Sequence, residues 1–258
     1  MNTEYVTLNK ANLATEHICC AIADKKHQPG VEIKKRWILD RLDEGHVFRK
    51  LDQKGKVFIE YAPLETAWTP VVGDGYLHIY CLWVSGSFKG KGHAKHLLEE
   101  CILAAKRQNK AGVCILSSKK KTPFLSEKSF FMKRGFEVCD SIDDYELLAL
   151  SFHGAKPTFS QSAKRRTIAH EELTIYYSPQ CPYIPNCIEQ ISAYCETNKI
   201  PLRLTKVDTL EKAKAAPCVF NNWAVFYKGK FQTVHLLNEG YLAKLMKSME
   251  QSAPSMPL

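Results

Sequence analysis

The sequence lacks several features that would assign it to a special class of protein. It contains no run of about 18 apolar residues, the length that a membrane-spanning helix needs. Its first residues, MNTE, are not followed by the basic and apolar stretches of a secretory signal. It has no internal repeats, and no stripe of arginine and aromatic residues marks a nucleic-acid-binding arm. We therefore expect a cytoplasmic protein that binds neither membranes nor nucleic acid.

The composition is that of an ordinary globular protein. Of the 258 residues, 45% are hydrophobic and 24% are charged, and this length suffices for one large domain or two modest ones. The net charge of +9 is spread over both halves and suits an anionic small ligand such as a nucleotide. Ten cysteines are many for a chain without an export signal, so we expect most of them to be reduced and buried as small apolar residues.

The first 150 residues predict an α/β fold, with a mixed α+β sheet covered by helices. Apolar periodicity and turn residues indicate strands at 5–9, 46–51, 56–62 and 76–84, helices at 12–24 and 31–43, and then a helix, a strand, a helix and two final strands. Residues 151–170 are rich in Ser, Gly, Lys and Arg with weak periodicity, which indicates a linker. Residues 171–258 predict a smaller α/β domain with strands at 172–178, 201–207, 218–227 and 230–235 and helices at 183–198 and 239–250.

The segment after the strand at 76–84 carries the clearest functional pattern. The loop Lys89-Gly90-Lys91-Gly92-His93-Ala94 leads directly into a helix whose apolar stripe is Ala94, Leu97, Leu98, Cys101, Ile102 and Ala105. The first turn of a helix has backbone N–H groups without partners, and its dipole attracts anions. Two glycines allow close approach of a ligand, and two lysines add positive charge. The pattern therefore predicts a site for a pyrophosphate.

Two common pyrophosphate loops do not fit the spacing. A P-loop needs Ser or Thr after its Lys, but Gly92 follows Lys91. A dinucleotide-binding fingerprint needs a third glycine at the position of Lys95.

The loop does resemble the Gln/Arg-x-x-Gly-x-Gly/Ala loop of the GNAT superfamily of N-acetyltransferases, with Lys89 at the position of the usual Arg or Gln. A strand before the loop, a strand at 113–118 and a late helix that ends in Lys133-Arg134-Gly135-Phe136 follow the family's order, so the resemblance covers roughly residues 1–150. It implies direct transfer of an acetyl group from acetyl-CoA to an amine of a small molecule or peptide. It also implies that acetyl-CoA lies in a splayed gap between the strands at 76–84 and 113–118. The implied cofactor-binding residues are Leu82, Trp83, Val84, Lys89, Gly90, Lys91, Gly92, His93, Ala94, Ser117 and Phe131.

The acid and base of the reaction are less well marked. The family commonly has a tyrosine four residues before the Gly-Phe glycine, where this chain has Phe131, so that phenol donor is absent. Candidates for the base are Glu60, His78 and Tyr80, and Cys139 is a candidate at the acceptor mouth. Each of the following has an alternative interpretation: Glu60 as a surface carboxylate, His78 as a hydrogen-bonded strand residue, and Cys139 as a half-buried strand residue.

The second segment has a different resemblance. Its strand, loop, Cys181-Pro182-Tyr183 and helix resemble the active-site edge of thioredoxin or glutaredoxin, and Ala216-Pro217-Cys218 resembles the cis-proline strand that faces it. However, five residues separate Cys181 from Cys187, whereas the redox motif has two. A GNAT domain followed by such a segment is similar to a group of bacterial acetyltransferases with a YoaP-like C-terminal domain.

Three functions are compatible with these patterns. The first is an acetyltransferase that holds no metal, with an acceptor site shaped by residues 25–30, the final strands of the first domain and the C-terminal domain. The second is a thiol-redox or thiol-binding protein that uses Cys181, Cys187 and Cys218, with the first domain as a CoA sensor. The third is a non-enzymatic acyl-CoA-binding module. The sequence leaves the oligomeric state open.

Cys19 and Cys20 lie on the first predicted helix near the expected acceptor, and periodicity places Cys19 inward.

Overall fold

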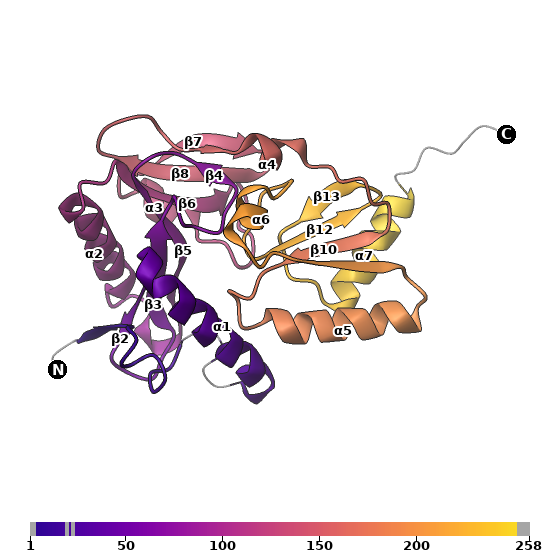
Figure 1. Ribbon diagram of the computed structural model, residues 1–258, viewed down its shortest axis with the longest axis horizontal. Helices are drawn as coiled ribbons and strands as arrows, with labels where there is room; N and C mark the ends of the chain where they lie inside the picture. The colour runs from indigo at the N-terminus through magenta and orange to yellow at the C-terminus, as the bar shows by residue number, and fades with distance from the viewer. Residues whose placement is uncertain (1–3, 19–20, 22–23, 252–258) are drawn as a thin grey trace.

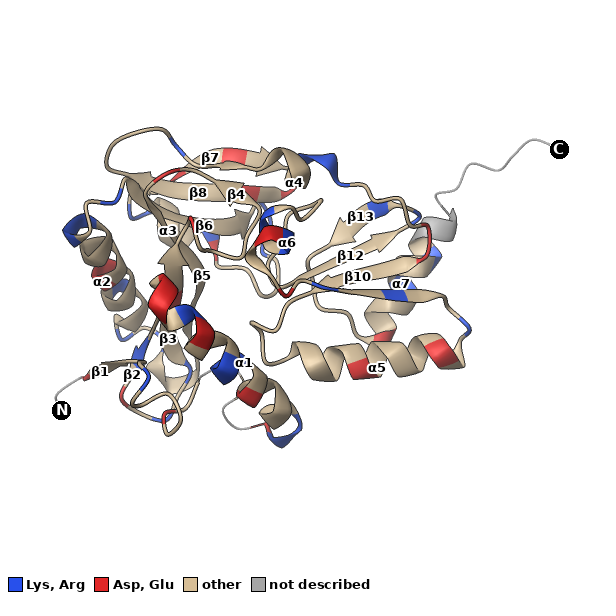
Figure 2. Ribbon diagram, viewed as in Figure 1, with Lys and Arg blue, Asp and Glu red and all other residues tan. Residues whose placement is uncertain are grey.

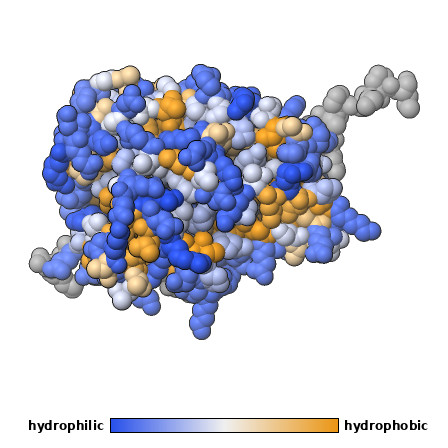
Figure 3. Space-filling view, in the orientation of Figure 1, coloured by the Kyte–Doolittle hydropathy of each residue, from blue (hydrophilic) through white to orange (hydrophobic). Residues whose placement is uncertain are grey.

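A computed structural model describes the chain except for residues 1–3, 19–20, 22–23 and 252–258 (Figure 1). Within the described residues, no helix is both long and apolar enough to cross a bilayer. Basic and acidic residues are interspersed along the ribbon of both halves in Figure 2. On the same face, hydrophilic residues predominate and apolar ones form separate patches (Figure 3).

The first half of the chain forms a seven-stranded sheet in the order β1-β2-β3-β5-β6-β8-β7. Its strands are β1 (Tyr5–Thr7), β2 (Val47–Leu51), β3 (Val57–Pro63), β5 (Tyr76–Val84), β6 (Gly112–Ser118), β7 (Glu137–Ile142) and β8 (Tyr145–Ser151). Neighbouring strands are antiparallel except for β5 and β6, which run parallel. This mixed sheet confirms the predicted fold class.

Helices pack on both faces of this sheet. They are α1 (Gln28–Arg41), α2 (His93–Arg107) and the short α3 (Lys128–Met132), with 3-10 turns η1 (Lys25–His27), η2 (Leu42–Glu44) and η3 (Gly86–Phe88). Val57 and Ile59 of β3 share a core with Leu97 of α2. Phe58, which lies between them, shares a different core with Trp37 of α1. The alternation of side chains along β3 therefore assigns α1 and α2 to opposite faces.

The helix predicted at 12–24 is wrong for the residues that the structure describes, because residues 10–16 form turns. The side chain of Asn9 accepts hydrogen bonds from the backbone N–H groups of Ala11 and Asn12. The side chain of Asn12 accepts a hydrogen bond from the backbone N–H of Asn9. Such local bonds offer the backbone an alternative to a helix. Cys19 and Cys20 lie outside the described residues.

The second half forms a four-stranded sheet in the order β11-β10-β12-β13. Its elements are β10 (Leu173–Tyr177), α5 (Ile184–Thr197), β11 (Leu202–Lys206), α6 (Leu210–Lys214), β12 (Trp223–Tyr227), β13 (Lys230–Thr233) and α7 (Glu239–Gln251). β10 and β11 are parallel, and β12 and β13 are antiparallel to their neighbours. The thioredoxin-like assignment of this half stays a prediction.

Two details of the second half differ from the prediction. No peptide bond among the described residues is cis, so the expected cis-proline at Pro217 is absent. The strand expected to start at residue 218 starts at Trp223 instead. Cys218 and Phe220, which precede it, are buried in a core that includes side chains of the first half. These residues therefore contribute to packing between the halves rather than to the sheet.

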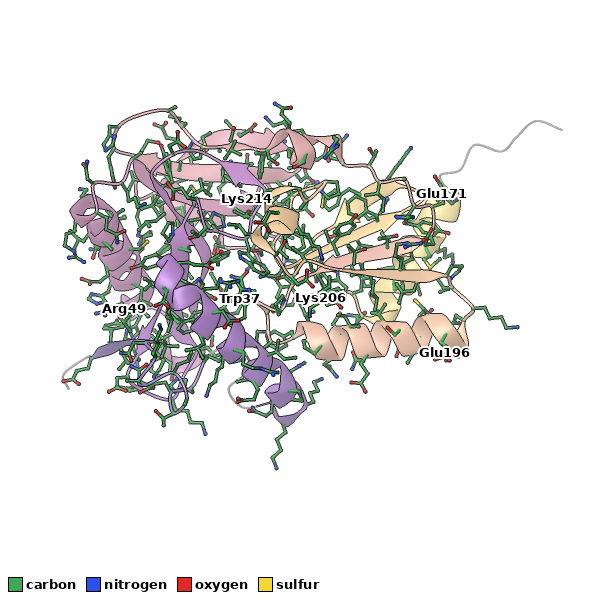
Figure 4. The ribbon with its side chains drawn as sticks, viewed as in Figure 1. Trp37, Arg49, Glu171, Glu196, Lys206 and Lys214 are labelled. Carbon is green, nitrogen blue, oxygen red and sulfur yellow. The ribbon has the colours of Figure 1, made fainter. Side chains whose placement is uncertain are left out.

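The two halves share their hydrophobic cores. Trp37 and Phe58 of the first half lie in one cluster with Ala213 and Phe220 of the second. The Nζ of Lys214 in α6 donates hydrogen bonds to the carbonyl of Leu64 at 2.6 Å and to that of Val71 at 3.2 Å. Figure 4 shows Trp37 and Lys214 at this junction. The second half is thus packed against the sheet of the first.

The segment predicted to be a linker takes part in this packing. It contains β9 (Thr158–Phe159), which pairs with β4 (Val71–Val72), and α4 (Gln161–Arg165). Phe159 and Ala163, four residues apart, are buried. The composition of residues 151–170 predicted a linker because these two apolar residues stand among polar ones, but their burial holds the segment against the rest of the protein.

Candidate active site

The start of α2 presents open backbone N–H groups. Gly92 is the N-cap of α2 with φ 84°, and no side chain caps the helix. A Cβ atom added at Gly90 or Gly92 would have no atom within 4 Å. The hydroxyl of Tyr5 lies 2.8 Å from Nδ1 of His93, which ties this helix start to β1. The loop therefore leaves room for an anion in front of a helix N-terminus.

The parallel pairing of β5 and β6 is short. It runs from Tyr76 opposite Gly112 to Ile79 opposite Ile115. Beyond that point β5 continues to Val84 paired with β3, and β6 continues to Ser118 paired with β8. The facing edges of β5 and β6 therefore have backbone groups that an extended ligand could pair with, beside the start of α2.

A β-bulge in β5 lies at the end of this pairing. Glu60 is opposite Cys81 and Tyr61 is opposite Ile79, so Tyr80 is the extra residue. The bulge puts Tyr80 and Cys81 on the same face of the sheet, where both pack against the core that contains α1. Leu82 and Val84 pack against the opposite core, which contains α2.

A pocket of about 510 Å³ lies over the bulge, between the two halves. Glu60, Tyr80, Cys81 and Trp83 line it from the sheet, and Lys26, His27 and Lys34 line it from η1 and α1. The second half contributes residues 180–184, the first turns of α5, Asn221, Asn222 and residues 234–238. Trp83, which is 43% exposed, is among the residues that line this open space. The volume is in the range of sites for small molecules.

Comparison with known proteins finds two families that match parts of the chain. Residues 12–136 match the Acetyltransferase (GNAT) family, and residues 201–244 match a family described as YoaP-like. The chain is 36% identical over 248 residues to the "Uncharacterized N-acetyltransferase YoaP" of Bacillus subtilis (strain 168), which covers 95% of this chain and 99% of the relative.

The chain belongs to the GNAT family of acetyltransferases. It is an acetyl-CoA-dependent N-acetyltransferase with a YoaP-like C-terminal segment. Solved structures similar to it include the PaiA N-acetyltransferase of Thermoplasma acidophilum in complex with coenzyme A, which is 15% identical with a TM-score of 0.42 and covers 59% of this chain and 100% of its own. A GNAT acetyltransferase of Brucella melitensis in complex with acetyl-CoA is 13% identical with a TM-score of 0.40, over 62% of this chain and 94% of its own.

Glu60 of this GNAT enzyme is part of a buried ionic cluster. Its side chain is 1% exposed, with Oε2 at 2.6 Å from Nζ of Lys34 and Oε1 at 3.2 Å from Nε2 of His46. Burial opposes ionisation, but Lys34 and His46 outweigh it and lower the pKa of Glu60 to about 2. The alternative that Glu60 is a surface carboxylate is wrong. The carboxylate stays ionised and is already engaged by two partners.

The other three predicted catalytic residues are also buried to different degrees. Burial, with a smaller effect of Lys214, lowers the pKa of His78 to about 3, and burial raises the pKa of Cys139 to about 11. Neither residue lines the pocket. Tyr80 does line it, and its hydroxyl accepts a hydrogen bond of 2.7 Å from the N–H of Trp68. Burial raises the pKa of Tyr80 above its ordinary value.

Two of the predicted cofactor-binding residues outside the loop, Phe131 and Ser117, have side chains that contact the protein itself. Phe131 is 1% exposed and packs edge-on against Phe136 with ring centroids 5.2 Å apart. The hydroxyl of Ser117 donates a 2.9 Å hydrogen bond to the carbonyl of Ser126.

The three possible redox cysteines differ in their surroundings. Cys181 lines the pocket and is half-buried. The thiol of Cys187 donates to the carbonyl of Leu237 at 3.0 Å, and burial raises its pKa to about 12. Cys218 is fully buried, which raises its pKa well above the ordinary value. No disulfide joins the cysteines that the structure describes, and those residues hold no group of three or more metal-ligating side chains.

Two pocket residues were missed by sequence reasoning. Gln180 is 1% exposed, and neither Oε1 nor Nε2 of its side chain has a hydrogen-bond partner. His27 is 7% exposed, its Nδ1 has no partner, and its Nε2 lies 3.4 Å from Oδ2 of Asp24. The segment 25–30 was expected to shape the acceptor site, but nothing in the sequence marked Gln180, because the pocket forms only when the second half packs on the first.

Proposed function

We propose that the enzyme acetylates an amine of a small molecule or peptide held in the pocket between its two halves. The observation that carries this proposal is the bulge at Tyr80: it puts Tyr80 and Cys81, which both line the pocket, on one face of β5 at the point where pairing with β6 ends. A ligand that extends along the unpaired edge of β5 would have one end at the start of α2 and the other at the pocket.

The residues at the start of α2 fit the pyrophosphate of acetyl-CoA, because Gly90 and Gly92 leave the space in front of the helix open. We assign Lys89, Gly90, Lys91, Gly92, His93 and Ala94 to the pyrophosphate, and the backbone of Leu82, Trp83 and Val84 to the pantetheine arm. Acetyl-CoA supplies an activated acetyl thioester. The role of the chain is to orient it and to receive a proton from the amine.

The charges in the pocket favour an amine that reacts in its neutral form. Glu60 is the acidic residue among the described residues of the lining, and it is already paired with Lys34 and in contact with His46. A protonated alkyl amine, with a pKa of about 10, therefore has no unpaired carboxylate to bind in this lining. It has to lose a proton before it can attack the thioester.

We assign this proton to His27. Burial, with a smaller effect of Lys26, outweighs Asp24 and lowers the pKa of His27, so the imidazole is neutral at physiological pH. With Nε2 toward Asp24, Nδ1 is the ring nitrogen without a protein partner, and we assign the lone pair that accepts the proton to this atom. The CoA thiolate is a far weaker base than the amine and leaves without the phenol that Phe131 lacks.

The experiment is release of CoA from acetyl-CoA with a panel of amines, preceded by calorimetric titration of acetyl-CoA and of NAD as a control dinucleotide. Binding of acetyl-CoA but not NAD, and CoA release that depends on an amine, are expected. Failure of acetyl-CoA to bind would reject the proposal.

The His27→Gln variant tests the base. We expect kcat/KM for the best amine of the panel to fall by about 100-fold or more, the usual contribution of a general base. The acidic limb of the wild-type pH profile, expected below the ordinary histidine value of 6.5 because the pKa is lowered, should disappear. His153→Gln, at an exposed position, is the matched control. A wild-type rate and pH profile in His27→Gln would exclude this role.

The redox alternative receives no positive support, since the thiols of Cys187 and Cys218 are buried and protonated at neutral pH. The cytoplasmic location and the boundary between the two domains stay predictions.

A further inference from the structure

Gln180 is the most unusual polar residue of the pocket. It lies between β10 and α5, in the second half of the chain, and its carboxamide is buried with both polar atoms unpartnered. Leaving a buried donor and a buried acceptor without partners is unfavourable, and native proteins rarely do so. The burial of the Gln180 carboxamide, unfavourable in the unliganded protein, is explained if a ligand in the pocket completes its hydrogen bonds.

The rest of the lining restricts the chemistry of that ligand. Its basic residues include Lys26 and Lys56, and its acidic residue, Glu60, is engaged by Lys34 and His46. Such a lining is unfavourable for a polyamine, which needs carboxylates. Several further residues with carboxamide side chains line the same pocket, namely Asn186, Gln190, Asn221, Asn222 and Asn238.

We propose that the acceptor is an amine that carries an amide group, as in an amino-acid amide or a short peptide, and that Gln180 recognises this amide. A carboxamide offers one donor and one acceptor side by side, and a peptide group presents the complementary pair. A carboxylate, by contrast, would leave Oε1 of Gln180 unpartnered. A pocket of about 510 Å³ holds a ligand of this size but not a folded protein.

This inference rests on the proposed function and gives the second half of the chain a purpose, since the amine is recognised by a residue of that half. Gln180 acts as a specificity residue, whereas His27 acts on the proton. The two roles predict different kinetic effects: loss of Gln180 raises KM for the acceptor, and loss of His27 lowers kcat.

The test uses matched acceptors with the full-length enzyme at saturating acetyl-CoA. For each of a set of side chains, CoA release is measured with the amino-acid amide, the free amino acid and the decarboxylated amine, and spermidine is included. We expect kcat/KM for the amides to exceed that for the decarboxylated amines by about tenfold or more, the effect of one or two hydrogen bonds. A preference for decarboxylated amines or spermidine would overturn the inference. So would a complete lack of acetylation by an enzyme that binds acetyl-CoA, and that result would leave the cofactor site of the proposed function intact.

The Gln180→Leu variant then assigns the recognition to this residue. We expect KM for the best amide acceptor to rise about tenfold, with the affinity for acetyl-CoA unchanged. Because leucine removes an unpartnered buried amide, the melting temperature of the unliganded protein should rise by about 2–4 °C. A purely structural glutamine would lower it when replaced. Gln108→Leu, at the exposed end of α2, is the control. An unchanged KM in Gln180→Leu, whatever the melting temperature, would overturn the assignment.

Discussion

Gly92→Val is the sharpest test of the pyrophosphate site, because a Cβ added at this position has no protein atom within 4 Å. A Cβ at Gly92 has nothing within 4 Å, so the substitution introduces no clash in the unliganded enzyme. Its cost to stability comes from the backbone, since φ is +84° and a left-handed conformation costs an L-residue about 1–2 kcal/mol. For a protein of this size that lowers the melting temperature by about 2–8 °C.

The effect on acetyl-CoA should be much larger. The valine side chain would occupy the space in front of the first turn of α2, where the pyrophosphate is expected. If it keeps the phosphate oxygens from two backbone N–H groups, each worth about 1.5–3 kcal/mol, affinity falls by at least about 100-fold. Isothermal titration calorimetry with acetyl-CoA measures this change, and thermal unfolding of the same samples measures stability.

Gly154→Val provides the matched control. Gly154 also has a left-handed backbone, with φ +75°, and an added Cβ would make only an ordinary contact of 3.8 Å with Ala111. That position adjoins the end of β6 where β5 and β6 are paired, so it should show the same loss of stability with wild-type affinity. Unchanged affinity in Gly92→Val, or an equal loss of affinity in Gly154→Val, would refute the assignment of this loop.

Two further predictions concern acid stability. Glu60→Gln breaks a buried ion pair, so it should reduce the free energy of unfolding at neutral pH by about 3 kcal/mol in urea titrations. The control is Glu172→Gln, in an exposed pair with Arg203, which should reduce the free energy of unfolding by less than about 1 kcal/mol. Because the folded pKa of Glu60 is lowered from 4.5 to about 2, its stabilisation is present above pH 4.5 and is lost as the pH falls toward 2, so Glu60→Gln should flatten the curve in that window. His78, whose folded pKa of about 3 lies below 6.5, should make wild-type stability fall as the pH drops from 6.5 toward 3, because only the unfolded chain takes up the proton. In His78→Asn the slope there should be shallower by up to about 1.4 kcal/mol per pH unit; an identical slope would show that the imidazole is not held neutral.

Several elements of the fold could be predicted because their signal is local. The apolar stripe of α2 and the glycines before it specify a helix start from a dozen neighbouring residues, and α2 begins at His93 as that pattern requires. The helix predicted at 12–24 had a similar periodicity but was wrong, because Asn9 and Asn12 form turns with the backbone. Periodicity cannot weigh such side-chain bonds against a helix.

The candidate site divides in the same way. The sequence by itself determined the family, the loop that we propose for the pyrophosphate and the strands beside it, because these depend on residue types at fixed short spacings. Only the tertiary structure decided that Glu60 is held by Lys34 and His46, and that the bulge turns Tyr80 and Cys81 to the same face. It also placed Gln180, about a hundred residues further along the chain than the bulge, on the wall of the same pocket. The physical reason is that burial and hydrogen-bond partnership are properties of pairs of distant segments, and no local pattern of residues carries that information.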